Sequence, residues 1–342
     1  LQQLADKVNN DGANFAGQTI TLLADIDLNN VEWTPIGNSS NPFSGTFDGN
    51  NHNISNLVVE GGSSSNQGLF GLTTNGEIKN LTINNAKVSG YLNVGVVAGT
   101  PYTSKYTNIK VTGHVEVNGM SYVGGVGGKN AYANWNTILV DVDETSYVKA
   151  NSIEDGKAYR TYVGGVCGFN GEGGHSFKDI TSNINVEGTT CDVGGLFGIA
   201  HYGNKFENCH SSGYVKITNA SDAADAEEIG GIAGVWHNGG ADVVFTDCSF
   251  TGKLETNVEG VDLLDNRITG KAYNKEGNGK LIINGITTTL VNSLEELNAA
   301  IKDGYNVIIT NNIAVANSEA GSNGYGATGI SQLNGGVIDG NG

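Results

Sequence analysis

The sequence contains no apolar run long enough to cross a membrane, and basic side chains and prolines are scarce. Among its 342 residues, 18 lysines and arginines stand against 35 aspartates and glutamates, so the formal net charge is −17. The missing run argues against membrane insertion, and the negative charge argues against nucleic acid and anionic membrane surfaces as partners. With only three prolines, the composition is typical of an elongated protein whose acidity keeps a long β surface in solution.

Sequence motifs for metals and cofactors are absent as well. The four cysteines form no Cys-x-x-Cys pair and no cysteine–histidine ligand spacing, so neither zinc nor redox chemistry is expected. No calcium-loop motif supports a calcium site in the acidic insertions. The sequence therefore predicts no metal and no cofactor. Cys209 and Cys248 fall in one apolar column, where they would pack as small hydrophobic side chains or form a disulfide.

A glycine-bearing phrase is present in six copies between Gly68 and Gly234, and its clearest form is Val193-Gly194-Gly195-Leu196-Phe197-Gly198. Self-similarity at a period of about 30 residues predicts a solenoid or an array, in which each unit buries its apolar side by stacking on neighbours. No helix pattern or Lys-Ser/Thr pair follows the glycines, so phosphate binding is not expected. The closing glycines are 28, 29, 40, 30 and 36 residues apart: Gly71, Gly99, Gly128, Gly168, Gly198 and Gly234.

Each phrase is followed by a second apolar stretch in which two side chains recur with a spacing of three, such as Phe177 and Ile180. These stretches are too short, too β-branched and too rich in glycine for helices, whereas strands of four to eight residues fit them. A β-propeller blade would need about 40–45 residues and more hairpin signals. The sequence therefore predicts an all-β fold, a parallel β-helix (solenoid).

The glycine pair predicts a corner in each unit. Val193 and Leu196 are both aliphatic, yet an unbroken strand would place them on opposite faces. A bend between them lets both side chains point inward, and glycine tolerates such a bend without steric cost.

Both ends of the chain carry a helix signal. Leu1, Leu4 and Val8 have helical spacing within residues 1–9, and similar intervals recur at about 294–302. Ser293 followed by Glu296 makes a capping box for the second helix.

These signals predict two units. We expect a β-helix with an N-terminal capping helix over 1–285, and the start of a second unit, a short helix followed by strands, over 286–342. A helix at the end of a solenoid covers its exposed apolar end. The first residue is Leu rather than Met, so any export signal is expected to have been removed. The chain is expected to be a monomeric segment of a larger polypeptide.

The recurrent Val-Gly-Gly-Leu-x-Gly phrase resembles the GLUG repeat, and the segment 43–57 looks like the strand-turn-strand opening that precedes such repeats. The resemblance covers most of residues 15–255. It implies a right-handed parallel β-helix in large secreted or surface-attached bacterial proteins, often described as adhesin-like. The family carries no established catalytic residues to transfer. The departures are degraded copies at Gly68 and Gly95 and insertions after Gly128 and around 221–228.

Catalysis is the alternative, because many β-helices cleave polysaccharides. A lyase needs a cation and a base, and a hydrolase needs two carboxyl groups facing one cleft. The two arginines, Arg160 and Arg267, lie in no repeat column with paired carboxylates, and the acidic clusters at 141–144 and 222–228 are expected to be solvated loop tips. The sequence therefore predicts that the chain is not an enzyme, with a polysaccharide lyase or glycoside hydrolase as the alternative.

Aromatic and histidine side chains give the strongest functional signal, because they recur two to four residues after the closing glycines. In a solenoid, equal offsets predict vertical stacking about one strand spacing apart. Such a row could stack on sugar rings or form a protein contact patch, unless the rings simply pack over the corner of their own coil. His201 and His237 lack a third ligand for a metal. The predicted ligand-binding residues are Tyr102, Tyr132, His201, Tyr202, Trp236 and His237.

Together these patterns predict an extracellular protein, secreted or on a cell surface, with an adhesin-like structural or binding role. Its loops would contact a glycan or a protein on a host or bacterial surface. A spacer with no ligand at all is the third alternative.

Overall fold

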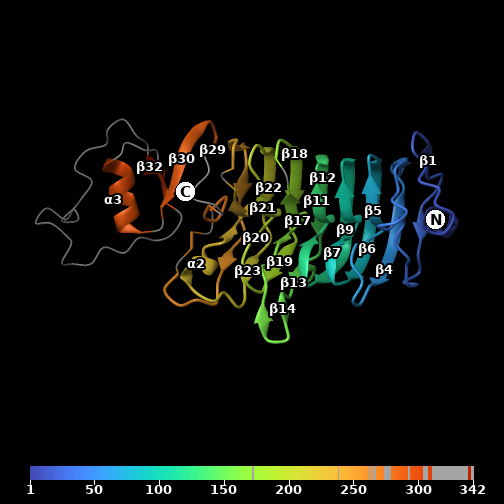
Figure 1. Cartoon of the computed structure of the whole chain (residues 1–342), viewed down its shortest axis with the longest axis horizontal. Helices are drawn as coiled ribbons and strands as arrows, with labels where there is room; N and C mark the ends of the chain where they lie inside the picture. Colours follow the sequence, from blue (N-terminus) through green and yellow to red (C-terminus); the bar gives the residue numbers. More distant parts are fainter. Residues whose placement is uncertain are drawn as a thin grey trace, which may run out of the picture.

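The computed structural model describes residues 1–171, 173–237, 239–261, 263–264, 267–272, 279–291, 293–302, 307–309 and 338–339. These residues form many short strands in parallel sheets and few helices, and Figure 1 shows the strands side by side in one long row. The helices are α1 (Gln2–Asn9), α2 (Ala223–Ala226) and α3 (Leu294–Lys302). None of the described helices is both long and apolar enough to pass through a bilayer.

Two sheets are built from the glycine phrases, and their strands are ordered in space as they are in the sequence. The first residues of each phrase form one sheet: β7 (Leu92–Gly95), β10 (Ser121–Gly124), β16 (Val163–Gly164), β20 (Val193–Gly194) and β24 (Ile229–Gly230). The last residues form the other: β5 (Phe70–Thr74), β8 (Ala98–Tyr102), β11 (Gly127–Ala131), β17 (Cys167–Gly171), β21 (Phe197–Ala200) and β25 (Ala233–Trp236).

A third, larger sheet contains the strands that follow the phrases and those near both ends of the chain. Up to residue 255 its strands are β1 (Thr19–Thr21), β2 (Ile26–Asp27), β3 (Thr46–Asp48), β4 (Asn53–Glu60), β6 (Glu77–Ser89), β9 (Lys105–Gly119), β12 (Asn134–Val142), β13 (Tyr147–Ala150), β18 (Ser176–Ser182), β19 (Asn185–Gly188), β22 (Lys205–Ser211), β23 (Val215–Ile217), β26 (Val243–Thr246), β27 (Ser249–Phe250) and β28 (Leu254–Glu255).

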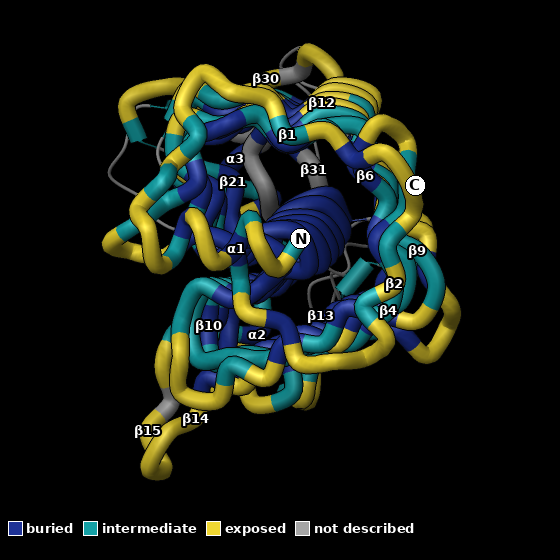
Figure 2. Tube along the Cα trace, turned by 90° about the vertical axis from the view of Figure 1, so that its right-hand side faces the viewer, coloured by how far each residue is buried: buried dark blue, intermediate teal, exposed yellow. Residues whose placement is uncertain are grey.

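The register superimposes the aliphatic rows of successive repeats. Val123 pairs with Val163, Val163 with Val193, and Val193 with Ile229, always in parallel strands. All of these side chains are fully buried. In Figure 2, which looks along the long axis, buried residues face the interior and exposed residues lie outside. The prediction of short, stacked parallel strands is confirmed.

The spacing of three in the large sheet has a backbone cause. Phe177 and Ile180 are both buried, and Asp179 between them has a left-handed φ of 55°. A left-handed residue breaks the strict alternation of a strand, so residues three apart reach the same side; Asn and Asp adopt this conformation most readily. Neighbouring strands repeat it at Asn80, Asn108, Thr137, Asn208 and Asp247. The spacing was predicted from the sequence, whereas these left-handed residues were not.

The predicted corner in the glycine phrase is confirmed, although its physical reason is different. Val193 and Leu196 are both fully buried on either side of the bend. Gly194 and Gly195 have no left-handed φ, so conformational freedom is not what requires glycine here. A Cβ on Gly195 would lie 2.0 Å from the carbonyl oxygen of Gly231 in the next repeat. Close approach of neighbouring backbones therefore excludes any side chain.

Rings stack inside the core along the row of strands. The ring centroids of Phe177 and Phe206 are 5.0 Å apart, and those of Phe206 and Phe245 are 4.7 Å apart. Cys209 and Cys248 lie in the neighbouring column, where the register on either side sets them opposite each other. Both are free thiols. The interior is thus a continuous apolar stack.

Helices lie at both ends of the row, as predicted. Ala5 and Val8 of α1 are buried in the common core, so this helix covers the N-terminal end. In α3, the backbone N–H of Glu296 donates to Oγ of Ser293 at 3.2 Å, which confirms the predicted helix start. The division at residue 285 stays a prediction.

Beyond α2 the chain departs from purely parallel pairing. The departure begins after β28, where the strands are β29 (Leu281–Ile283), β30 (Ile286–Val291), β31 (Val307–Ile309) and β32 (Ile338–Asp339), and β29 pairs antiparallel with β30. β31 pairs in parallel with both β30 and β32. β31 and β32 follow α3, where strands were predicted. The parts of the predicted second unit at 303–306, 310–337 and 340–342 lie outside the described residues.

Two insertions leave the row of strands. The first forms the antiparallel hairpin of β14 (Ile153–Glu154) and β15 (Lys157–Ala158), which projects from the body in Figures 1 and 2. The second contains α2, where Oδ1 of Asp222 accepts a hydrogen bond from the backbone N–H of Asp225 at 2.9 Å.

Candidate functional site

The predicted aromatic column lies along the turn between the second phrase-derived strand of each unit and the large sheet. Tyr102 ends β8 and Tyr132 directly follows β11. Their ring centroids are 5.8 Å apart with an interplanar angle of 80°, an edge-to-face contact. Each side chain is 41% exposed. The structure therefore brings these two predicted residues together on the surface.

His175 continues the row, although it is not among the predicted residues. Its ring centroid is 5.8 Å from that of Tyr132. It lies seven residues after the closing Gly168, because the turn in this repeat is longer, so counting from that glycine did not find it. Counting back from the next strand gives no common offset either: Tyr102, Tyr132 and His175 lie three, two and one residues before β9, β12 and β18.

Tyr202 extends the row into the following repeat. A Cβ on Gly173 would lie 2.7 Å from the Tyr202 ring, and one on Gly239 would lie 2.2 Å from it. The ring is thus held between two glycines of neighbouring repeats, where any side chain would displace it. We call the surface formed by Tyr102, Tyr132, His175 and Tyr202 the aromatic corner.

The two predicted histidines lie behind the aromatic corner. The ring centroids of His201 and His237 are 4.5 Å apart, and that of Tyr202 is 4.3 Å from His201. All three side chains are half-buried, as is Trp236, which packs against the core. Nδ1 of His201 and Nε1 of Trp236 are buried, and neither atom is hydrogen-bonded to a described residue. Among the six predicted residues, Tyr102 contacts Tyr132, and the rings of His201, Tyr202 and His237 contact one another.

The histidines behind the corner are held neutral. Burial, together with the neighbouring His237, lowers the pKa of His201 to about 4, and burial also lowers the pKa of His237. At neutral pH both rings therefore offer uncharged nitrogen atoms.

Acid should destabilise the protein through His201. Its folded pKa lies below the ordinary value of 6.5, so its contribution is complete above pH 6.5 and is lost as the pH falls toward 4. The His201→Phe variant keeps a ring without a titrating group. We expect the wild type to lose on the order of 1 kcal/mol relative to this variant between pH 7 and pH 4.5. Denaturant unfolding at both pH values measures the difference, and a pH-independent difference would contradict the prediction.

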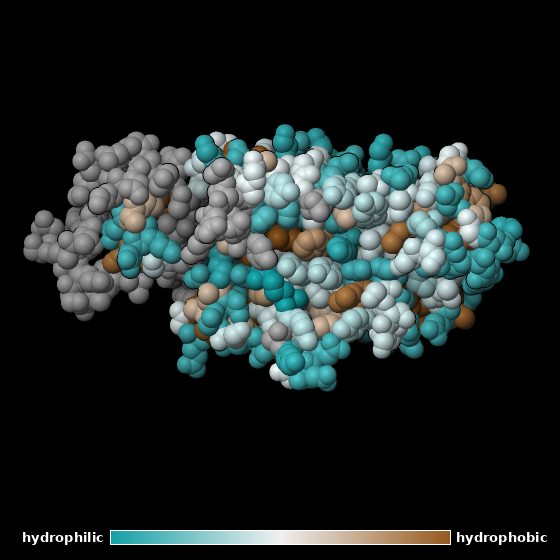
Figure 3. Space-filling view, in the orientation of Figure 1, coloured by the Kyte–Doolittle hydropathy of each residue, from teal (hydrophilic) through white to brown (hydrophobic). Residues whose placement is uncertain are grey.

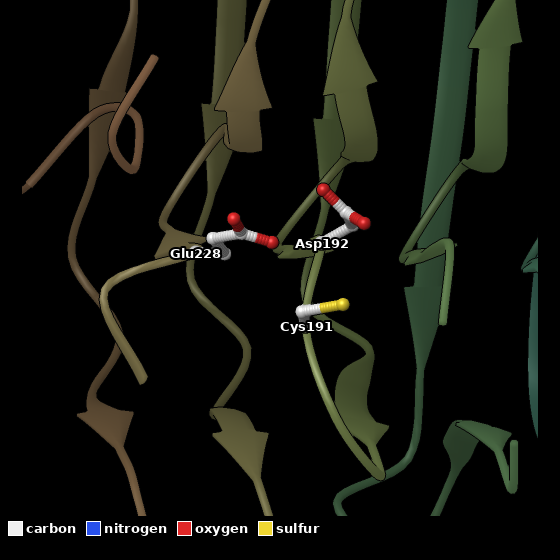
Figure 4. A group of neighbouring side chains, drawn as sticks. All are labelled: Cys191, Asp192 and Glu228. Carbon is white, nitrogen blue, oxygen red and sulfur yellow. The ribbon is translucent and has the colours of Figure 1, made fainter. Parts of the chain in front are cut away.

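A second cluster lies buried among the strands of the first phrase-derived sheet (Figure 4). Asp192 directly precedes β20 and Glu228 directly precedes β24, so the two residues occupy the same position in neighbouring repeats. Their side chains are 0% and 6% exposed. Arg160 reaches both: its Nε and Nη2 donate to Asp192 at 2.7 and 2.8 Å, and Nη2 donates to Glu228 at 2.6 Å.

This cluster corrects two sequence predictions. Arg160 does pair with two carboxylates, although it lies three residues before β16 rather than in their column. Glu228 is 5% exposed rather than a solvated loop tip, whereas Asp222 is exposed as expected. Asp192 and Glu228 both stand directly before their glycine phrase, and this shared position was the signal in the sequence that could have predicted that they lie on neighbouring strands.

Cys191 completes a group whose ligand atoms, with those of Asp192 and Glu228, all lie within 4.8 Å of one another. Arg160 already bonds to both carboxylates, and Nζ of Lys271 lies 3.3 Å from Glu228. Two cations thus balance two carboxylates, which is the arrangement of an ion-pair network rather than of an open metal site. Burial raises the pKa of the Cys191 thiol and raises that of Asp192 to about 7.

A third group lies on the large sheet, with His114 and Glu116 on β9 and Asp143 directly after β12. Nδ1 of His114 lies 3.0 Å from Asp143 and Nε2 lies 3.3 Å from Glu116. Both carboxylates raise the pKa of His114. A groove of about 390 Å³ opens beside this histidine. Asp143 is exposed, as the sequence predicted, although it bonds to His114.

Comparisons with known proteins give limited matches. No family model matches the chain. Halomucin from Haloquadratum walsbyi is 39% identical to it over 141 residues, which is 38% of this chain and 2% of halomucin. A crystal structure from Bacteroides ovatus, provisionally assigned as an immunoglobulin A1 protease, is similar with a TM-score of 0.46 at 19% identity. That likeness covers 94% of this chain and 89% of the solved chain.

The prediction that the chain is not an enzyme does not stand, because the solved structure that it resembles has a protease assignment. At a TM-score of 0.46 and 19% identity, the likeness transfers neither that activity nor a site to this chain.

Proposed function

We propose that the chain is a segment of a secreted or cell-surface protein that binds glycans through the aromatic corner. In this proposal it folds as a right-handed parallel β-helix of GLUG-type repeats. The parallel register of successive phrases supports the β-helix, and the similarity to halomucin supports the location.

The exposed edge-to-face pair of Tyr102 and Tyr132 carries the proposal. A sugar ring has one face of C–H groups and a rim of hydroxyl groups, so it needs an aromatic platform with polar neighbours. Both tyrosines are 41% exposed, and each carries a phenol hydroxyl. Asn134 and Ser176, both exposed, follow the corner directly in sequence.

The rest of the surface favours a glycan over a protein partner. A protein interface needs a contiguous apolar patch at its centre. On the face seen in Figure 3 the hydrophobic spots are small and separated by hydrophilic surface. The large hydrophobic side chains that the structure describes as exposed are scattered along the chain: Leu23, Val31, Tyr102, Tyr132, Ile153 and Tyr159.

Removal of both exposed rings should abolish most of the binding. For the Tyr102→Ala/Tyr132→Ala variant we expect the Kd for a bound glycan to rise about tenfold or more, since each ring contributes about 0.5–1.5 kcal/mol. The measurement is calorimetric titration with glycans first selected on an array. Tyr159→Ala is the matched control, because Tyr159 is 47% exposed but lies beside the projecting hairpin.

Unchanged affinity in the double variant would overturn the proposal, as would binding of proteins but of no glycan. The same incubations are assayed for new reducing ends and for unsaturated products. Such products would add a catalytic role to the binding surface, and the variants would then be compared by turnover.

A further inference from the structure

A polar groove lies next to the aromatic corner on the outer face of the large sheet. Its volume is about 280 Å³, and its lining includes Lys105, Thr107, Asn134, Asn136, Ser176 and Lys178. These are long cationic side chains, amides and hydroxyls, which are the groups that hydrogen-bond to sugar hydroxyls and carboxylates.

The groove and the aromatic corner form one continuous surface. Lys105 is three residues after Tyr102, Asn134 is two residues after Tyr132, and Ser176 directly follows His175. The strands that begin there are paired in register, with Lys105 opposite Asn134 and the backbone N–H of Ser176 donating to Oδ1 of Asn134 at 3.2 Å. A ligand resting on the rings therefore meets the polar row next.

The polar row contains two lysines three strands apart. One strand beyond Lys105, Glu77 lies opposite it and is ion-paired with Lys79 at 3.4 Å. Ser176 pairs with Lys205, so the row runs Lys105, Asn134, Ser176, Lys205 across four neighbouring strands. At a strand spacing of about 4.8 Å, the two lysines are roughly 14 Å apart along the row. This separation suits an oligosaccharide rather than a single sugar.

Neither of the two lysines is neutralised within the part of the chain that the structure describes. Lys105 and Lys205 form no ion pair there, whereas Lys178 in the next row is bonded to Glu207 at 2.6 Å. Lys105 lines the groove, and Lys205 lies one strand beyond the lining residue Ser176. A carboxylate on the ligand would supply the missing partner for each.

We infer that the ligand of the aromatic corner is an acidic oligosaccharide, with sugar rings on Tyr102 and Tyr132 and uronate carboxylates on Lys105 and Lys205. This inference rests on the proposed glycan-binding function and names the class of glycan. Thr107, Asn134 and Asn136 would bond to the sugar hydroxyls. Attraction between exposed charges is screened by salt, so the preference for acidic sugars should weaken as salt is added.

The test compares oligogalacturonate with its neutral methyl ester on the whole chain. We expect the acidic form to bind at least tenfold more tightly at low salt, and this ratio to fall toward one in 0.5 M salt at a Debye length of about 4 Å. Lys105→Gln/Lys205→Gln should remove the ratio while leaving the ester bound. Lys110→Gln is the matched control, since Lys110 is an exposed lysine farther along the same strand, β9.

Each outcome tests one of three claims: the acidic class of the ligand, the role of the two lysines, or the glycan-binding function. Equal affinity for acid and ester would overturn the acidic class while the glycan-binding function stands. An acid preference that persists in Lys105→Gln/Lys205→Gln would overturn the assignment of these lysines. Binding of neither form, with no other glycan bound on the array, would overturn the proposed function itself.

Discussion

Replacing Arg160 by methionine is expected to lower the free energy of unfolding by about 3–5 kcal/mol. The reason is the pair of carboxylates that this guanidinium joins. Asp192 is fully buried and Glu228 nearly so, and loss of the guanidinium leaves Asp192 without the cation that bonds to it. The Arg160 side chain is itself 36% exposed, so water can enter in its place and the lower end of the range is expected.

Thermal and denaturant unfolding measure this loss, and two comparisons identify its cause. The added Asp192→Asn change should recover part of the stability, because it removes the buried charge and Asn tolerates the left-handed φ of 55° at this position. Lys178→Met breaks an exposed pair of similar length and should cost less than about 1 kcal/mol. A loss as small for Arg160→Met as for Lys178→Met would contradict the network's importance.

The effect of pH on the Arg160 variant follows from the same burial. The pKa of Asp192 is already raised to about 7, and loss of the guanidinium should raise it further. A carboxylate with a raised folded pKa binds its proton more readily in the folded state, so its destabilising effect grows as the pH rises above 3.8. The difference between variant and wild type should therefore shrink in acid.

Replacing Gly195 by alanine is expected to cost about 3 kcal/mol or more. The new methyl group would lie 2.0 Å from the carbonyl oxygen of Gly231, and that oxygen belongs to the backbone rather than to a flexible side chain. The strand cannot easily move aside, because the backbone N–H of Gly195 donates to the carbonyl of Gly230 at 3.0 Å. Repeats stacked in register thus prevent local relief of the clash.

Gly240→Ala is the control for this experiment. A Cβ there meets no atom within 4 Å, and the residue has no left-handed φ, so the change should leave stability within about 0.5 kcal/mol. Denaturant unfolding of both variants gives the comparison. Equal stability of the two alanine variants would show that neighbouring repeats can separate to admit a methyl group.

Much of the architecture could be predicted because it repeats. A corner at Gly194 and Gly195 and the paired burial of Phe177 and Ile180 each occur in several copies, so a local pattern was visible many times. The physical reason for each pattern could not be predicted from the sequence. The close backbone approach at Gly195 depends on the spacing between repeats, which no single repeat encodes.

The candidate site was predictable only where it follows the repeat. Tyr102 and Tyr132 meet because they share their place in the turn. His175 escaped detection because the turn before it is longer. Arg160 contacts Asp192 and Glu228 from outside their column. That contact depends on how an irregular segment packs against the regular strands. Periodicity predicts regular elements well and irregular ones poorly.

The parallel register has a kinetic consequence. Partners in the row of strands are about 30 positions apart in the chain, as Val163 and Val193 are, so the relative contact order is on the order of 0.1, close to that of helical proteins. Parallel sheets usually fold slowly because their strands are distant in sequence, and here they are not. During synthesis, each newly made strand can therefore pair with a neighbouring strand that has already folded.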